Sequence, residues 1–205
     1  MALAGGRIAS RVYSRLGALV TASQLDPGRM ELWWTDEQFV PTDDPARNAG
    51  HALAVLAGQF PLDPARTHPM PAADGVADNA AAAATYAKEL GDTVFDICLL
   101  GLGEDGDVAS IFPGHPSSEP TTHAVIAVND APKPPPERTS LSLTTLARSR
   151  EVWFLVSGAE KADAVARALA SDPTIPGGVL RGTQRTVWFL DAAAAARLPY
   201  YDCAF

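Results

Sequence analysis

The stretch of sequence that decides the fold runs from Phe95 to Gly114 and reads FDICLLGLGEDGDVASIFPG. Its first part is a near-continuous apolar run, which is typical of a fully buried strand in a parallel sheet. Three glycines and three acidic residues follow within residues 101–107. Open α/β sheets bind their ligands at the carboxyl ends of strands, and glycine lets the backbone approach a ligand closely. We therefore expect the functional site in this turn.

Length and composition indicate one ordinary globular domain, which we expect to span residues 1–205. The chain is 47% hydrophobic and 20% charged, so it has enough apolar residues to build a core. Its net charge of −8 argues against general binding to nucleic acid or to anionic membranes. No apolar run approaches the roughly 18 residues of a membrane span, and residues 1–6 are too short for a secretory signal. We expect a cytoplasmic protein; its oligomeric state stays open.

Predicted strands and helices alternate along the chain, which indicates a mostly parallel α/β sheet. Besides the run that begins at Phe95, strands are expected at residues 2–4, 31–34, 123–128, 140–143, 151–156 and 186–190. Helices are expected at residues 9–19, 46–60, after a cap at Asp78, at 144–150, after a capping box at 157–160, and after Asp191. The polar residues 35–41 are expected to form a loop at the carboxyl end of a strand.

Three details of the pattern concern individual side chains. The helix that follows residue 160 is expected to bury Ala162, Val165, Ala166 and Leu169, which recur at helical spacing. Cys98 is expected to be a small buried hydrophobe, and neither it nor Cys203 lies in a metal-binding spacing. Arginines at positions 7, 11 and 15 share one helix face. The first, beside two glycines, is the better ligand candidate, while the other two fit a solvated face.

Residues 101–114 closely resemble the signature of the 6-phosphogluconolactonases, G-x-G-x-D-G-H-T/V-A-S-L/I-F-P. Four further blocks are similar to the family's, in the family's order. Residues 2–6 resemble the end of L-S-G-G-S/R-T-P, and residues 34–48 resemble W-G-D-E-R-x-V-P…S-N. The segment from Pro132 resembles P-K-P-P-x-R-I-T-L, and residues 151–169 resemble a strand and helix of the type V-W-F-L-V-x-G-x-x-K-A.

The resemblance implies a Rossmann-like sheet flanked by helices, related to glucosamine-6-phosphate deaminases and ribose-5-phosphate isomerases. It also implies hydrolysis of 6-phospho-D-glucono-1,5-lactone to 6-phosphogluconate in the oxidative pentose phosphate pathway, without a metal or an organic cofactor. A base removes a proton from the attacking water, donors stabilise the oxyanion, and bound phosphate orients the ring. The deaminases carry Asn-Glu-Pro after the glycine turn, whereas residues 110–113 here have the lactonase form.

The resemblance also assigns site residues. In the family the base is the histidine after the Asp-Gly pair, and this chain has Asp107 at that position. The candidates for binding substrate are Gly5, Gly6, Arg7, Gln38, Gly103, Asp105, Gly106, Lys133 and Arg138. For several of them a structural role remains the alternative: a plain turn for the first two, surface charge for the last two, and hydrogen bonding within the loop for Asp105.

The chain departs from the family pattern at functional positions. Besides Asp107, it has Gln38 where the family has arginine and Ile8-Ala9 where the family has Thr-Pro. The strand and helix that precede the family's L-S-G-G are absent, so the chain is expected to begin inside a core strand. An aspartate, with a reference pKa of about 3.9, is a weaker base than histidine, and losing a positioned base costs roughly 10²–10⁴ in rate.

These departures leave two interpretations. The first is a lactonase with weakened activity, in which Asp107 or the nearby His115 acts as the base. The second is a catalytically silent domain that binds a sugar phosphate or a protein partner.

Overall fold

A six-stranded parallel sheet forms the centre of the molecule. The structure, a computed structural model, describes residues 1–22 and 26–199. In spatial order the strands are β4 (Thr67–His68), β2 (Leu32–Trp34), β1 (Ala2–Leu3), β5 (Ile97–Leu100), β8 (Glu151–Val156) and β9 (Arg185–Leu190). Every neighbouring pair is parallel. The predicted mostly parallel α/β sheet is therefore confirmed.

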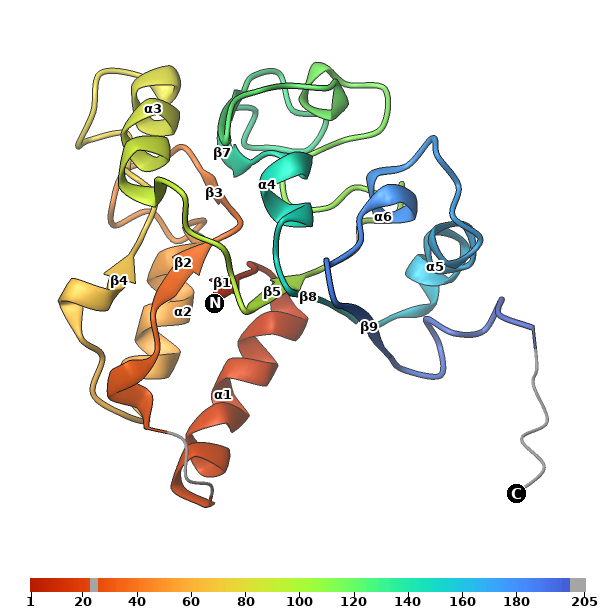
Figure 1. Ribbon diagram of the computed structural model, residues 1–205, viewed down its shortest axis with the longest axis horizontal. Coiled ribbons are helices and arrows are strands. Elements are labelled where there is room, and N and C mark those ends of the chain that lie inside the picture. Colours follow the sequence, from red (N-terminus) through yellow and green to blue (C-terminus); the bar gives the residue numbers. More distant parts are fainter. Residues whose placement is uncertain (23–25, 200–205) are drawn as a thin grey trace.

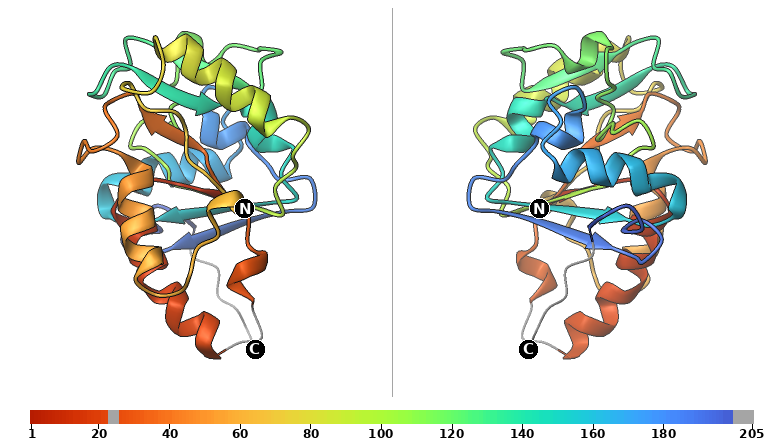
Figure 2. Two further views of the ribbon diagram at one scale, coloured as in Figure 1. Left: turned by 90° about the vertical axis from the view of Figure 1, so that its left-hand side faces the viewer. Right: turned by 90° about the vertical axis from the view of Figure 1, so that its right-hand side faces the viewer.

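Helices lie on both sides of this sheet (Figures 1 and 2). They are α1 (Arg7–Ala22), α2 (Asn48–Ala57), α3 (Asn79–Leu90), α4 (Leu143–Ala147), α5 (Ala162–Leu169) and α6 (Pro176–Val179). Short 3₁₀ turns cover Pro27–Arg29, Pro64–Arg66, Pro116–Ser118 and Ala159–Lys161. In Figure 1, α1 and α2 lie below the large sheet and the other helices lie above it. No helix among the described residues is long and apolar enough to cross a bilayer.

A second, three-stranded antiparallel sheet stands above the large one, with α3 packed against it (Figure 2). Its order is β3 (Asp36–Gln38), β7 (Arg138–Leu141) and β6 (Val125–Val128). The loop predicted for residues 35–41 is therefore wrong in part. The polar residues of β3 form a strand because β7, about a hundred residues away in sequence, supplies the backbone partners.

Two predicted details of the middle region are confirmed. Asp78 caps α3, because its Oδ1 accepts a hydrogen bond of 2.7 Å from the N–H of Ala81. Cys98 is fully buried in β5, and burial raises the pKa of its thiol to about 12. Cys203 lies outside the described residues.

Two predictions near the end of the chain are wrong in detail. Ser157 does not cap the following helix, because its hydroxyl donates to Asp191 at 2.7 Å. Asp191 does accept a hydrogen bond from the N–H of Ala194, as a helix cap would. The segment after it nevertheless forms a series of turns rather than the predicted helix.

The buried face of α5 also differs from the prediction. Ala162 and Val165 are buried as expected, but Ala164 and Ala168 complete that face, and Leu169 is 41% exposed. The 3₁₀ turn before α5 has fewer residues per turn than an α-helix. The turn itself lies outside residues 162–169, and within α5 the buried stripe is centred on residues 164, 165 and 168, so that residue 169 falls outside it.

Candidate functional site

The glycine turn after β5 is closed by its own backbone and presents Asp107. The N–H of Gly103 donates to the carbonyl of Asp107 at 2.8 Å, and Gly106 has a φ of +87°, which favours glycine. The carboxylate of Asp107 lies directly over Gly103, where a Cβ would be 1.8 Å from its Oδ1. The side chain is only 10% exposed. The glycine at 106 therefore permits the backbone turn, and the glycine at 103 leaves room for the Asp107 carboxylate, which any larger residue there would displace.

Two adjoining cavities lie at the carboxyl ends of β1 and β5, with volumes of about 280 and 340 Å³. They share Gly5, Gly6, Gly101 and Leu102, and we treat them as one cleft. The smaller cavity, here called the carboxylate half, is lined among others by Asp36, Gln38, Asn48, Asp107 and Arg138. The larger cavity, here called the basic half, is lined among others by Arg7, Arg11, Ser157, Glu160 and Lys161.

Asp36 is a second carboxylate in the cleft, held at the start of β3. It accepts hydrogen bonds from the hydroxyls of Ser110 at 2.7 Å and Thr35 at 3.2 Å. Burial raises the pKa of Asp36, although the Ser110 hydrogen bond and the charge of Arg138 oppose that shift. The negative charge of Asp107 acts in the same direction as burial. The carboxylate half thus contains two carboxylates in different environments.

Glu37 does not line the cleft, but it fixes the position of Asn48, which does. Its carboxylate accepts from the N–H groups of Asn48 at 2.7 Å and Ala49 at 2.9 Å, which are orphan donors at the start of α2. The Asn48 side chain donates to the carbonyl of Asp36 at 3.1 Å and packs on Gly5, where a Cβ would be 2.0 Å from its Oδ1. Gly5 is therefore required for this close packing.

The basic half is built from two helical starts. Gly6, with a φ of +94°, turns the chain into α1, and exposed Arg7 follows it. Within residues 1–22 and 26–199, Arg7 has no carboxylate at ion-pair distance. Lys161, at the end of the 3₁₀ turn that precedes α5, lies 3.8 Å from Glu104. Cations beside the N-terminus of a helix are suited to hold a phosphate.

Lys133 and Arg138, two predicted substrate ligands, make contacts within the protein. The Lys133 ammonium lies 2.6 Å from Asp107 Oδ1 and 3.6 Å from Asp105. The Arg138 guanidinium donates to the carbonyls of Lys133, Pro134 and Pro135 at 3.0–3.1 Å. Arg138 also lines the carboxylate half, whereas Lys133 lines neither half of the cleft.

Residues 1–188 match the family described as glucosamine-6-phosphate isomerases and 6-phosphogluconolactonase. The chain belongs to this family. The 6-phosphogluconolactonase of Streptomyces coelicolor is 44% identical over 96% of this chain and 81% of the relative. The human 6-phosphogluconolactonase is 33% identical over 97% of this chain and 80% of the relative. The crystal structure of the Thermotoga maritima 6-phosphogluconolactonase matches with a TM-score of 0.81 and 29% identity, over 92% of this chain and 83% of that one.

Membership of this family confirms the resemblance read from the five sequence blocks. The cleft contains Gly5, Gly6, Arg7, Gln38, Gly103 and Asp107 from the predicted set, together with Arg138. Gly106 and Asp105 belong to the same turn but line neither cavity. Sequence reasoning gave no role to Asp36, Asn48 or Lys161, although all three lie inside the blocks that match the lactonase signatures. Arg11, expected on a solvated face, lines the basic half.

His115 does not reach the cleft. Its Nδ1 lies 3.0 Å from the Ser117 hydroxyl and its Nε2 lies 3.0 Å from the Asn129 carbonyl. These contacts hold the ring beside a separate cavity near β6. The structure therefore contradicts the suggestion that His115 replaces the histidine of the family signature.

Among the described residues, no group of three or more His, Cys, Asp or Glu side chains could hold a metal ion.

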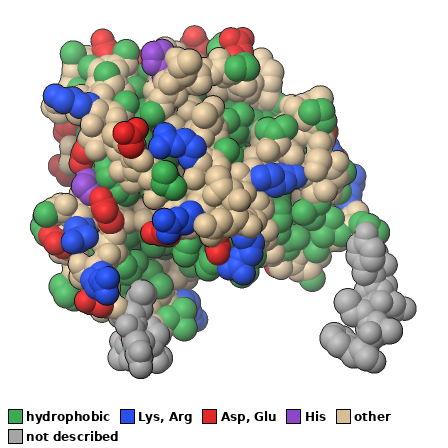
Figure 3. Space-filling model, in the orientation of Figure 1, with side chains coloured by type: hydrophobic (Ala, Val, Ile, Leu, Met, Phe, Trp, Pro, Cys, Tyr) green, Lys and Arg blue, Asp and Glu red, His purple; other side chains and the backbone are tan. Residues whose placement is uncertain are grey.

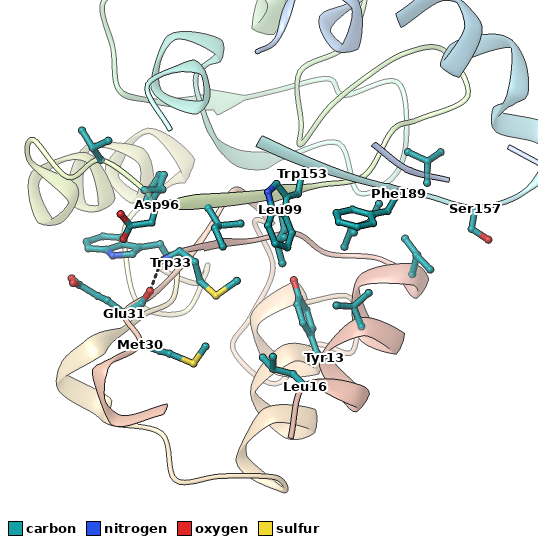
Figure 4. Close-up of a pocket in the computed structure, with 18 of the residues that line it drawn as sticks. Tyr13, Leu16, Met30, Glu31, Trp33, Asp96, Leu99, Trp153, Ser157 and Phe189 are labelled. Atoms are coloured by element: carbon teal, nitrogen blue, oxygen red, sulfur yellow. Dashed lines mark hydrogen bonds between the residues drawn. The ribbon is translucent and has the colours of Figure 1, made fainter. Parts of the chain in front are cut away.

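A larger cavity of about 950 Å³ lies on the face of the large sheet beside α1 (Figure 4). Trp33, Leu99, Trp153 and Phe189 point into it from the sheet, facing Tyr13 and other side chains of α1. Figure 3, in the orientation of Figure 1, shows hydrophobic side chains at the surface in the lower part of the molecule. None of the predicted site residues lines this apolar groove. The cleft, with its convergent charged groups, is the better candidate for chemistry.

Proposed function

We propose that this protein hydrolyses 6-phospho-D-glucono-1,5-lactone to 6-phosphogluconate, in the oxidative pentose phosphate pathway. One observation carries the proposal beyond family membership. A single cleft joins a half that contains Asp107 to a half lined by Arg7, Arg11 and Lys161. A phosphorylated sugar lactone has two corresponding parts, an electrophilic carbonyl and a dianionic phosphate.

The phosphate occupies the basic half in this proposal. Arg7 and Lys161 supply positive charge there, and the first turn of α1 supplies N–H groups that have no partner within the helix. Binding the phosphate fixes the orientation of the sugar ring and so converts a bimolecular attack into one between positioned groups. The lactone carbonyl then points into the carboxylate half.

Hydrolysis begins when Asp107 takes a proton from a water molecule whose oxygen attacks the lactone carbonyl carbon. Gln38 and Asn48 line this half, and their amide groups can donate hydrogen bonds to the developing oxyanion. When the intermediate collapses, the bond between the carbonyl carbon and the ring oxygen breaks. The ring oxygen leaves as a hydroxyl, taking back the proton held by Asp107, and the carbonyl carbon becomes the carboxylic acid of 6-phosphogluconate.

A second candidate function is binding of a sugar phosphate without turnover. The ion pair between Asp107 and Lys133 favours it, because one oxygen of this carboxylate is engaged by a side chain of the protein itself. Replacement of the family's arginine by Gln38 also removes a charged donor.

Lactone hydrolysis above the spontaneous rate separates the two functions. We expect the natural chain to be active and Asp107→Asn to lose roughly 10²-fold or more. Asp96→Asn, which changes an exposed carboxylate just before β5, is the matched control and should keep full activity. The double variant Asp107→His with Gln38→Arg should be faster than the natural chain.

Two results would contradict this proposal. Binding of 6-phosphogluconate by a natural chain that shows no turnover would establish the silent domain instead. A folded Asp107→Asn variant that keeps the activity of the natural chain would show that position 107 does not supply the base.

A further inference from the structure

Lys133 approaches Asp107 from outside the cleft. Its ammonium contacts Asp107 Oδ1 at 2.6 Å, yet Lys133 is absent from the lining of both cavities. The lysine side chain is 40% exposed and the aspartate side chain only 10%. The lysine thus contacts a largely buried carboxylate while part of its own side chain stays in solvent.

The loop that carries Lys133 is held in place by Arg138. This arginine belongs to β7, and its guanidinium donates to the carbonyls of residues 133, 134 and 135. Pro134, Pro135 and Pro136 further restrict the backbone of the loop. The Phe112 ring lies 5.9 Å from both cationic groups and packs beneath them. The Lys133–Asp107 contact is thus linked, through the proline loop and Arg138, to strand β7 of the three-stranded sheet.

The contact uses one carboxylate oxygen and leaves the other available. Asp107 Oδ1 accepts from Lys133, and in the described part of the chain no hydrogen bond to Oδ2 is found. An ionised carboxylate accepts through both oxygens. With Oδ1 fixed by Lys133 and the backbone of Gly103 beneath the carboxylate, Oδ2 is the oxygen left to accept a proton from water.

We infer that Lys133 is a positioning residue for Asp107, and that it is not a ligand of the substrate phosphate as the family resemblance implied. The inference rests on the proposed function, because Asp107 is taken as the base. The phosphate is then held by the cations that do line the basic half, with Lys161 among them. The arrangement depends on Asp107, since a histidine at position 107, as in the family signature, could not form the same ion pair.

Lys133→Met tests the inference through turnover and product binding together. A misplaced catalytic group costs up to about 10²-fold in rate. We expect a fall in kcat of roughly 10- to 100-fold, with the Kd for 6-phosphogluconate, measured by calorimetry, within about 3-fold of the natural chain. Lys133→Arg keeps the charge and should restore most of kcat. Lys161→Met should raise the Kd about 10-fold or more, and Lys88→Met on the exposed face of α3 is the control for charge alone.

The double variant Asp107→Asn with Lys133→Met gives an independent readout. If the lysine acts through the aspartate, the double variant should have the kcat of Asp107→Asn alone. Additive losses in kcat would overturn the inference. So would a Kd for Lys133→Met that rises as much as that of Lys161→Met.

Product binding also keeps this inference separate from the proposed function. Absence of turnover in the natural chain would refute the proposed function. Retained 6-phosphogluconate binding by Lys133→Met would even then support the exclusion of Lys133 from the phosphate site, and lost binding would overturn it.

Discussion

Asp36→Asn should stabilise the protein at neutral pH, although it removes a charged hydrogen-bond acceptor. The substitution keeps the shape of the side chain, and the neighbours can satisfy it. The Asn oxygen can accept from Ser110, as Asp36 does now at 2.7 Å. The Asn amide can donate to the Thr35 hydroxyl oxygen, while that hydroxyl donates to the Leu3 carbonyl at 3.2 Å. The change therefore mainly removes a buried charge.

The sign of the effect follows from the pKa of Asp36. Burial raises that pKa in the folded protein above its value in the unfolded chain. Between the two pKa values the folded state binds more protons, so the free energy of unfolding falls as the pH rises through that window. With an uncharged Asn at position 36, the free energy of unfolding does not fall for this reason as the pH rises. A buried charge costs a few kcal/mol even when it is hydrogen bonded, and the nearby Arg138 recovers part of that cost. We expect a gain of about 1–3 kcal/mol at pH 7.

Urea unfolding between pH 4 and pH 8 measures this difference directly. The gain should be largest at neutral pH and should shrink toward zero near pH 4, with a rise in Tm of about 5 °C at pH 7. Burial also raises the pKa of Glu37, so part of the pH dependence will remain in both proteins. Asp43→Asn, on the exposed surface, is the control. A gain that does not vary with pH, or a loss of more than 1 kcal/mol at pH 7, would refute the reasoning.

Three further predictions concern buried groups. Asn79→Ala should lower the free energy of unfolding by about 2–4 kcal/mol in urea titrations, because its buried amide makes hydrogen bonds of 2.7–3.1 Å to β6 and β7. Gly103→Ala should reduce lactone hydrolysis at least about 10-fold in a folded protein, because the added Cβ displaces the Asp107 carboxylate. In a Cys203→Ser background, Cys98 should react with a thiol reagent at pH 8 only after unfolding, because burial raises its pKa to about 12.

The strands and helices that could be predicted are those with a local signal. Apolar runs marked five of the six strands of the large sheet, and Asp78 marked the start of α3. The edge strand β4 was not predicted, because its two residues, Thr67 and His68, form no apolar run. The strand β3 carried no such signal, because its three residues are all polar and its partner β7 is distant in sequence. The buried face of α5 was misplaced because its many alanines fit more than one helical stripe, and the structure buries Ala164 and Ala168.

The location of the site was predictable, whereas the partners of its side chains were not. The glycine turn after an apolar run identified the cleft and Asp107. The contacts of Lys133 and Arg138 depend on a bent proline loop that returns to that turn from residues 133–138. Charge and motif position alone could not show that both cations are engaged within the protein.

The packing of Asp107 on Gly103 constrains how this sequence can change. Any side chain at position 103 would overlap the Asp107 carboxylate. Gly103 must therefore be retained as long as the side chain of residue 107 packs on it. No comparable barrier protects position 107, because its side chain points into a cavity. An aspartate codon becomes a histidine codon through one nucleotide substitution. The family's histidine is therefore one mutational step away, on a backbone that would not have to be rebuilt.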